Sequence, residues 1–374
     1  MLTLLLLVIF AALVFEFING FHDTANSIAT VVATKVLSPG KAVMLAATMN
    51  LFGAFFGTAV AKTISTGLID PAVVQVTSQV ILCALLGGIS WNLITWWFGL
   101  PSSSSHALIG GLCGAALSAA NLNWHALIWS QPSAEGWTKS KGLLWKVVMP
   151  MVTSPLAGFI LGVLILGTLY ALIAGLRKMP NPLSRLSRPR WVNAFFGKAQ
   201  LVSAAYMGFA HGSNDAQKTM GIIALALFGA EAAGTLKTLP PWLAFLHPTS
   251  SDSAHIDSWI IVICALVMAA GTAAGGWRII KTLGHKMVKL QPIDGFAAET
   301  ASATILVTAA HLGMPVSTTH SISTAIMGVG FGKNPRALKI TVIERIIWAW
   351  IMTIPAAGGM AFLLYKIVAF LGWA

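Results

Sequence analysis

The stretches GFHDTANS, Gly20–Ser27, and GSNDAQKT, Gly212–Thr219, each place an aspartate inside an otherwise apolar segment. These residues, Asp23 and Asp215, follow the first glycine of their stretch by three positions. A carboxylate at the centre of a membrane helix costs roughly 2.5–3.5 kcal/mol, so it is usually functional and faces a partner or a wet cavity. A loop outside the bilayer is the alternative, but apolar residues continue closely on both sides. We therefore expect both stretches to lie within the membrane.

The composition indicates a membrane protein. Of the 374 residues, 56% are hydrophobic and only 9% are charged, whereas soluble domains carry roughly 25% charged residues. Because lipid offers no hydrogen-bond partner to unpaired backbone, we predict an all-α integral membrane protein in contact with membrane lipid. The net charge of +12 comes from short basic clusters between apolar spans, which fits the positive-inside rule better than a nucleic-acid partner. The three cysteines are isolated and predict no disulfide framework or metal cluster.

The order of the motifs repeats along the chain. After each aspartate motif comes a Gly-x-Pro-x-Ser-x-x-His pattern, at Gly99–His106 and at Gly313–His320. Five predicted crossings separate the two aspartate motifs, and because five is odd, the second copy enters the membrane upside down. This predicts two inverted-topology transmembrane repeats, 1–176 and 199–374, joined by a basic cytoplasmic linker, 177–198.

The predicted architecture has about 10–12 transmembrane segments. Repeats of this kind hold their substrate near the midplane on discontinuous helices, so we expect broken helices at the two aspartate motifs. The apolar spans that follow the hydroxyl motifs are short, and either full crossings or short re-entrant hairpin segments would accommodate them. With the linker in the cytoplasm, fifteen Lys and Arg residues are cytoplasmic and five are external, which predicts that both termini are external. The five external cations are Lys62, Lys139, Lys141, Lys146 and Lys237.

The hydroxyl motifs PSSSSH, Pro101–His106, and PVSTTH, Pro315–His320, each precede a new apolar segment. Ser or Thr before a helix is typical of an N-cap. Free N–H groups and the positive end of the dipole make a helix start suitable for an anion. Two such starts, brought together by the inversion, could hold a small tetrahedral anion from two sides. Ordinary capping and back-bonding to the helix is the alternative for each copy taken alone.

The aspartates suggest that a cation accompanies this anion. Carboxylates, with the amides of Asn26, Asn214 and Gln217, are hard oxygen ligands for Na⁺ or a divalent ion, and a carboxylate can also take a proton. Lys218 adds a positive charge, and His22 can carry a proton near neutral pH. A neutral His22 bonded to backbone and an internal Lys218–Asp215 ion pair are the alternatives.

Two further acids lie in apolar runs. Glu16 and Glu299 are candidates for a proton or cation relay, and a position near the membrane interface is the alternative for Glu16. We assign no resident metal or other cofactor from the sequence. The ions considered are co-transported H⁺ or Na⁺, and a divalent metal bound to the anion.

At these motifs the chain resembles the inorganic phosphate transporter (PiT) family, and the resemblance covers most of its length. GFHDTANSIAT and HGSNDAQKTMG resemble the repeated Asp/Asn signatures of the family, and PSSSSHALIGG and PVSTTHSISTAIMG resemble its paired hydroxyl loops. The resemblance implies secondary transport of phosphate, driven by Na⁺ or protons, in some members as a metal–phosphate complex. The positions that it marks for substrate binding are Asp23, Asn26, Ser103, Ser104, Ser105, Asn214, Asp215, Ser317, Thr318 and Thr319.

Departures from the usual signatures refine this expectation. His22 replaces the usual Asn, and the second motif contains Gln217 and Lys218. Both features resemble the bacterial low-affinity, proton-coupled branch, so we expect a symporter of the bacterial inner membrane, with a homodimer left open. The competing functions are transport of another tetrahedral oxyanion such as sulfate, an anion channel, and a membrane-embedded hydrolase. The symmetry of the hydroxyl motifs and the lack of a nucleophile elbow argue against an enzyme.

Overall fold

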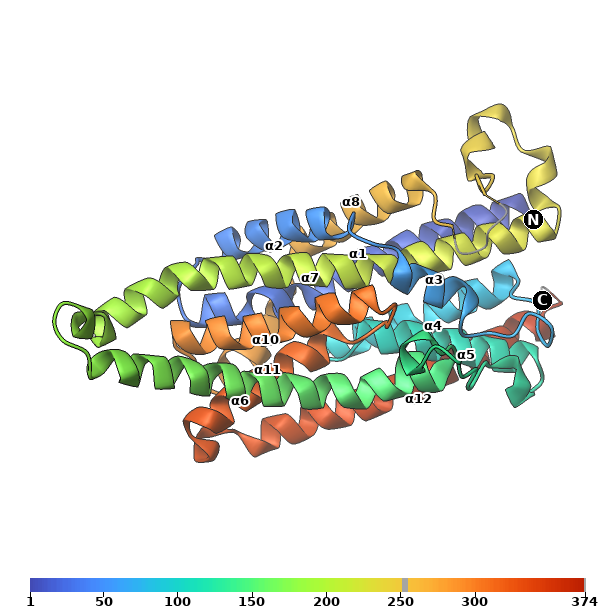
Figure 1. Ribbon diagram of the computed structural model, residues 1–374. Coiled ribbons are helices and arrows are strands. Elements are labelled where there is room, and N and C mark those ends of the chain that lie inside the picture. Colours follow the sequence, from blue (N-terminus) through green and yellow to red (C-terminus); the bar gives the residue numbers. More distant parts are fainter. Residues whose placement is uncertain (251–254, 373–374) are drawn as a thin grey trace.

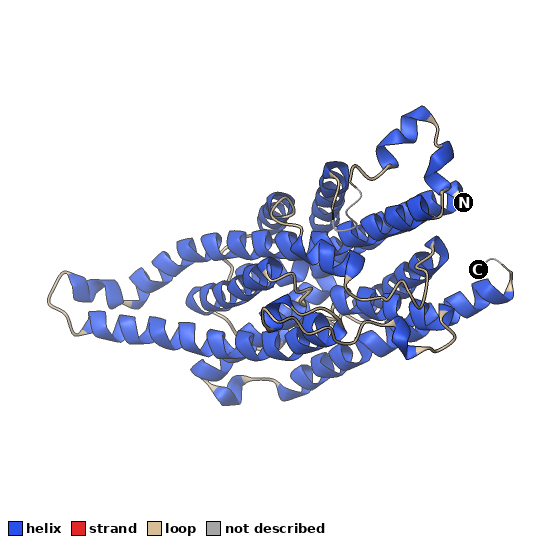
Figure 2. Ribbon diagram, turned by 45° about the vertical axis from the view of Figure 1, so that its right-hand side comes forward, coloured by secondary structure: helices blue, strands red, loops and turns tan. Residues whose placement is uncertain are grey.

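The computed structural model describes residues 1–250 and 255–372, and within them the chain is built from helices with no strand (Figure 2). The predicted all-α class is confirmed. The α-helices are α1 (Leu2–Ala33), α2 (Pro39–Gly53), α3 (Ala59–Thr66), α4 (Ser78–Trp97), α5 (Ser104–Ala119), α6 (Met149–Arg177), α7 (Pro189–Ala232), α8 (Ser258–Ala274), α9 (Trp277–Lys281), α10 (Pro292–His311), α11 (Thr318–Lys333) and α12 (Ile340–Phe370).

Several of these helices can cross a membrane. By length and apolar composition, α1, α4, α12 and the continuous segment Leu144–Arg177 qualify among the described residues. The helix pair Ser258–Ala274 and Trp277–Gly284, which is bent by 58°, has the composition of a broken span or a re-entrant loop. The outer face of α6 shows exposed apolar side chains one turn apart, at Val152, Leu156, Ile160 and Leu164. Such a stripe is unfavourable in water and favourable in lipid. The molecule is an integral membrane protein.

The two ends of the molecule are distinct in Figure 1. Both chain termini lie at one end, and the connection from α6 to α7 lies at the opposite end. Helix α7 begins at Pro189, a residue suited to the first turn of a helix, and not near 199 as the predicted linker implied. The connection is therefore the shorter segment 178–188, which still carries Lys178, Arg185 and Arg188.

The aspartate motifs do not interrupt their helices. We predicted breaks there, but α1 and α7 continue through both motifs. Polar side chains bond to carbonyls of their own helix instead: Thr24 Oγ1 donates to the Gly20 carbonyl at 2.7 Å, and Ser213 Oγ donates to the Ala210 carbonyl at 3.0 Å. Since hydroxyls can be satisfied in this way without unwinding the backbone, the prediction of broken helices at these motifs is wrong.

Two helical hairpins meet in the middle of the molecule. Helices α4 and α5 lie in the half that holds the termini, and α10 and α11 lie in the other half (Figure 1). Gly99 and Gly313 end α4 and α10 with φ of +64° and +63°, a conformation that glycine adopts readily. The loops that follow bring His106 and His320 together, with ring centroids 4.8 Å apart. The starts of α5 and α11 therefore face each other, as the repeated motifs predict.

Helices from the first half of the sequence pack on helices from the second half. Helix α1 packs on α8 while α7 packs on α2, and α5 packs on α12 while α11 packs on α6. Helices α1 and α7 run in opposite directions in Figure 1, which an inverted repeat requires. The first glycine of each aspartate motif lies at such a crossing. A Cβ atom on Gly20 would lie 2.4 Å from the Met268 carbonyl oxygen, and one on Gly212 would lie 2.2 Å from the Asn50 carbonyl oxygen.

We expect Gly212→Ala to destabilise the protein by about 1–3 kcal/mol, because the added methyl group forces α2 away from α7. The thermal unfolding midpoint of the purified protein in detergent measures this loss. Gly197→Ala is the matched control, since it lies on the same helix and has no atom within 4 Å of its would-be Cβ. Equal midpoints for the two variants would mean that this contact does not hold the helices together.

Candidate functional site

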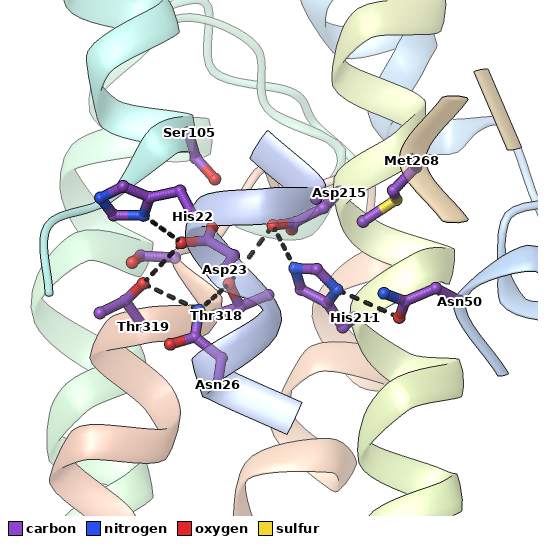
Figure 3. A network of polar contacts seen from close by, with 12 residues as sticks. His22, Asp23, Asn26, Asn50, Ser105, His211, Asp215, Met268, Thr318 and Thr319 are labelled. Carbon is purple, nitrogen blue, oxygen red and sulfur yellow. Dashed lines mark hydrogen bonds and ion pairs between the residues drawn. The ribbon is translucent and has the colours of Figure 1, made fainter. Parts of the chain in front are cut away.

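A buried polar cluster lies where α1, α7 and the two hairpin tips meet. Figure 3 shows the carboxyl groups of Asp23 and Asp215 near each other, with Thr318 and Thr319 of α11 beside them. Thr319 Oγ1 donates to Asp23 Oδ1 at 3.4 Å, and Thr318 Oγ1 donates to Asp215 Oδ2 at 3.3 Å. All four side chains are buried. The two aspartate motifs, distant in sequence, therefore form one site.

The hydroxyls of the hairpin tips divide between two tasks. Ser103 and Ser317 accept hydrogen bonds from the backbone N–H of His106 and His320, at 3.2 and 3.1 Å. For these two serines the capping interpretation holds. The next residue of the first tip, Ser104, has a buried Oγ with no partner among the described residues. Its hydroxyl is available to a ligand at the start of α5.

Lys218 ties the two halves of the site together. Its ammonium group contacts Asp215 Oδ1 and Ser105 Oγ, and it donates to the Val316 carbonyl at 3.1 Å. The internal ion pair with Asp215, left open by the sequence, is present. Because Lys218 is only 2% exposed, its charge and that of Asp215 are strongly coupled in this site.

The amides of Asn26 and Asn214 differ in the hydrogen bonds that they make in the cluster. Asn26 Nδ2 donates to Thr318 Oγ1 at 3.1 Å and to Thr319 Oγ1 at 2.9 Å, whereas Asn214 Nδ2 makes a longer bond of 3.4 Å to the Met314 carbonyl. The Oδ1 atoms of both asparagines are buried and unpaired among the described residues. A buried polar atom without a partner costs about 1–3 kcal/mol. These two oxygens therefore indicate a place where a ligand or ion can bind.

His22 contacts Asp23, the aspartate of the first motif. Its Nδ1 lies 2.7 Å from Asp23 Oδ1, and its Nε2 lies 3.3 Å from Thr95 Oγ1 and 3.5 Å from Ser102 Oγ. The alternative of a histidine bonded to backbone does not apply, because all three partners are side chains. His22 therefore links the Asp23 carboxylate of α1 to the end of α4 and to the first hairpin tip.

His211 is a site residue that the sequence reasoning missed. Its Nε2 lies 3.3 Å from Asp215 Oδ2, and its Nδ1 lies 3.1 Å from Asn50 Oδ1. Asn50 Nδ2 in turn donates to Thr272 Oγ1 at 2.8 Å, which directs Asn50 Oδ1 toward the imidazole. His211 stands four residues before Asp215, so helical spacing already placed both on one face of α7. Asn50 and Thr272 could not be found in this way, because they come from α2 and α8.

Three of the residues predicted to relay a proton or cation lie outside the central cluster: Glu16, Gln217 and Glu299. Glu16 accepts a hydrogen bond from Thr219, and its other oxygen has no described partner. Gln217 bonds to its own helix and to α3, where its Oε1 accepts from the Val60 N–H at 2.8 Å. This amide holds α3 against α7 and does not face the aspartates.

Glu299 forms a second polar cluster. Its Oε1 accepts from Thr30 Oγ1 at 2.5 Å and from Gln200 Nε2 at 3.2 Å, and its Oε2 accepts from Ser203 Oγ. Thr30 lies seven residues after Asp23 on α1, and Glu16 lies seven residues before it. This spacing is close to two helical turns, or about 10 Å. Glu16, Asp23 and Thr30 therefore share one face of α1, and all three are buried.

The chemistry of the central cluster suits an anion and a cation together. Hydroxyls, an ammonium group and the starts of α5 and α11 are donors for an oxyanion. Asp23, His211 and Asp215 each offer a ligand atom, and these atoms all lie within 4.8 Å of one another. Nitrogen and carboxylate oxygen are acceptable ligands for several cations and for a proton.

Comparison with known proteins agrees with these features. The model of the Phosphate transporter family matches residues 19–361. A probable low-affinity inorganic phosphate transporter of Rhizobium meliloti is 42% identical over 363 residues, covering 97% of this chain and 96% of that protein. The protein of the same description in Bacillus subtilis is 40% identical over 371 residues and covers 98% of both chains.

A solved structure shares the fold. The sodium-dependent phosphate transporter superposes with a TM-score of 0.78 at 21% identity, covering 99% of this chain and 100% of that one. At this identity the likeness concerns the fold. Family membership follows from the family match across nearly the whole chain and from the relatives near 40% identity. This chain is a member of the phosphate transporter family, whose members are transporters and not enzymes.

Proposed function

We propose that this protein is a secondary active symporter that carries inorganic phosphate through the central cluster together with protons or another cation. The observation that carries the proposal is the joining of Asp23 and Asp215 to hydroxyls and Lys218 in one buried site. A phosphate anion placed beside two carboxylates is unfavourable unless a positive charge accompanies it. Co-transport of a cation provides that charge.

Phosphate binds, in this proposal, between the two hairpin tips. The helix starts of α5 and α11 point toward each other there and present free N–H groups. Asn26 and Asn214 border the same space with the motif hydroxyls, and Lys218 supplies a cationic side chain. The capping serines Ser103 and Ser317 accept through Oγ, and each can still donate its O–H to an anion. The proposed phosphate ligands are Asn26, Ser103, Ser104, Ser105, Asn214, Ser317, Thr318 and Thr319, with Asp23 and Asp215 holding the cation that neutralises the phosphate.

The coupling cation binds between Asp23, His211 and Asp215. With Nδ1 of His211 donating to Asn50 Oδ1, Nε2 faces Asp215 Oδ2 at 3.3 Å. An unprotonated Nε2 would place a second acceptor beside this oxygen. Two acceptors at this distance repel each other unless a proton or a metal ion lies between them. This contact makes a proton our first choice of coupling ion, with Na⁺ or a divalent metal travelling with phosphate as the alternatives.

Glu16 and Glu299 extend the proton route beyond the site. Glu16 lies on α1 about two turns before Asp23, and Glu299 contacts Thr30, which lies on α1 about two turns after Asp23. Each is buried without a cationic partner among the described residues, and such a carboxyl group favours taking a proton or a cation. We assign to them the relay between the central cluster and the two ends of the molecule.

Uptake under separate gradients tests the function. Purified protein in proteoliposomes should accumulate radiolabelled phosphate under an imposed pH gradient, and an Na⁺ gradient or added Mg²⁺ should have a smaller effect. No uptake under any of these conditions would remove the proposal. Excess unlabelled sulfate tests selectivity: if it suppresses uptake as strongly as unlabelled phosphate does, the substrate is a broader class of oxyanion.

Glu299→Gln should lower uptake driven by a pH gradient at least about tenfold, equal to about 1.4 kcal/mol. The amide oxygen can still accept from Thr30 and Gln200 and the amide nitrogen can donate to Ser203 Oγ, but the amide cannot release a proton. Exchange of labelled for unlabelled phosphate at equal pH should continue, since exchange needs no net proton transfer. Glu344→Gln, at an exposed position, is the control. Loss of exchange together with net uptake would assign Glu299 to binding and not to the relay.

The proposal includes the arrangement in the membrane. Two inverted repeats, one on either side of the connection 178–188, form the site, and both termini face the outside of a bacterial inner membrane. Reporter tags on either terminus should be accessible to a membrane-impermeant reagent in intact cells. A tag that reacts only after the membrane is permeabilised would contradict this orientation.

A further inference from the structure

A cationic cavity opens beside the central cluster. It has a volume of about 380 Å³ and lies between α3, the segment 138–146 and the end of α10. Among the described residues, its lining contains four lysines and one histidine but no acidic residue. Lys146 is buried and donates to the carbonyls of Thr138 and Leu312, both at 2.9 Å. The remaining basic residues of the lining are exposed: Lys62, Lys139, Lys141 and His311.

These lysines are unexpected on their side of the molecule. Loops on the predicted external side should contain few cations, and the sequence has only five there. Four of the five line this cavity, and the exception is Lys237. Helix α3 lies in the half of the molecule that holds both termini (Figure 1). Apart from Lys237 and from Lys366, which donates to Asn121 Oδ1 near the end of α12, the external positive charge is therefore concentrated at one opening.

One short segment separates the cavity from the site. On the cavity side, the Leu312 carbonyl accepts a hydrogen bond from Lys146. On the site side, the Met314 carbonyl accepts from Asn214 and the Val316 carbonyl accepts from Lys218. A chain of four residues spans at most about 14 Å. An anion in the cavity is thus close to the phosphate ligands and is separated from them by the tip of the α10–α11 hairpin.

The corresponding position at the other hairpin holds an arginine that is engaged by neighbouring groups. Thr282 Oγ1 donates to the Gly99 carbonyl at 2.9 Å, as Thr63 Oγ1 donates to the Gly313 carbonyl at 2.7 Å. At the first hairpin, however, Arg278 donates to the Trp97 carbonyl at 2.7 Å and lies 4.8 and 4.4 Å from the Trp96 and Trp97 rings. Its charge is engaged by these rings. The approach to the site beside the α10–α11 hairpin therefore has lysine side chains that are unengaged among the described residues, whereas the one beside the α4–α5 hairpin has an arginine held by two tryptophans.

We propose that the cavity is an access vestibule, in which Lys62, Lys139 and Lys141 collect inorganic phosphate from the external solution before it passes the hairpin tip. This inference rests on the proposed function. A concave surface of one charge concentrates ions of the opposite sign and raises their rate of association by about 10- to 1,000-fold. The effect acts on capture, so it determines the apparent KM at limiting phosphate and not the maximal rate.

The test is phosphate uptake by right-side-out membrane vesicles containing the variant Lys62→Gln/Lys139→Gln/Lys141→Gln. We expect the apparent KM for phosphate to rise about tenfold at low ionic strength, with the maximal rate unchanged. Salt at about 0.5 M should remove most of the difference, because it screens exposed charges beyond a few Å. The variant with three Lys→Arg changes keeps the charge and should retain the original KM, and Lys237→Gln controls for charge outside the cavity. Lys146 stays unchanged because it holds two carbonyls.

The outcomes separate the two proposals. A wild-type protein that takes up no phosphate removes the proposed function. A wild type that transports while the triple Gln variant keeps its KM removes the vestibule alone. An increase in KM that appears only in inverted vesicles would also overturn the vestibule, because the cavity would then open to the inside. A matching increase in Lys237→Gln would show a general surface-charge effect and not capture in this cavity.

Discussion

Replacing Asp23 by asparagine is expected to abolish coupled phosphate uptake while the fold stays intact. The side chain is isosteric, and its Oδ1 can still accept from His22 and from Thr319. What is lost is the negative charge that faces the coupling cation beside His211 and Asp215. A hydrogen bond or contact to a buried charge contributes about 1.5–3 kcal/mol, so the affinity for the cation should fall about 10- to 100-fold.

Two measurements on Asp23→Asn separate function from stability. Uptake into proteoliposomes should fall to the background of empty liposomes, and the unfolding midpoint in detergent should stay close to that of the wild type. Asp70→Asn is the matched control, because Asp70 lies outside the cluster and accepts a hydrogen bond from its neighbour, the Ala72 N–H. Near-normal uptake by Asp23→Asn would contradict the role that we give this carboxylate.

The features of the fold that the sequence predicted well are those that local chemistry decides. Apolar runs and few charges were sufficient for the helical membrane class. Ser103 and Ser317 marked the starts of α5 and α11, because capping needs only a hydroxyl and the next few N–H groups. The repeat of these signals in the same order indicated which motifs would meet.

The errors arose where a side chain had a choice of partner. Thr24 and Ser213 were in motifs that looked polar enough to break a helix, but their hydroxyls bond to the carbonyls of their own helices. Sequence alone does not tell whether a hydroxyl turns inward to its helix or outward to a ligand. Gln217 shows the same ambiguity, since its amide holds α3 and does not join the aspartates.

The site residues that the sequence did not reveal depend on packing between helices. His211 was visible by its spacing from Asp215, but its partner Asn50 is defined only by the crossing of α2 and α7 at Gly212. Thr30 and Ser203 likewise become partners of Glu299 only when α1, α7 and α10 come together. Contacts of this kind follow from helix geometry across the whole chain and leave no local pattern.

The ion pair between Asp215 and Lys218 provides the second large effect. Asp215→Asn should destabilise the protein by about 3–5 kcal/mol, because it leaves the buried Lys218 ammonium without its counter-charge. Lys218→Gln should also be destabilising, because it leaves the Asp215 carboxylate with Thr318 and His211 as its contacts and without the lysine charge. Removing both charges together, in Asp215→Asn/Lys218→Gln, should recover much of the stability, since no unpaired charge then remains buried.

A double-mutant cycle measures this coupling. We expect an interaction energy of about 1–3 kcal/mol from unfolding of the two single variants and the double variant, and no coupled uptake by Asp215→Asn or by the double variant. Stability would then return without transport, because the neutral pair holds the helices but binds neither phosphate nor its cation. Single effects that simply add would mean that the two charges act independently. Uptake restored in the double variant would assign the pair to the scaffold and leave phosphate binding to the hydroxyls and amides alone.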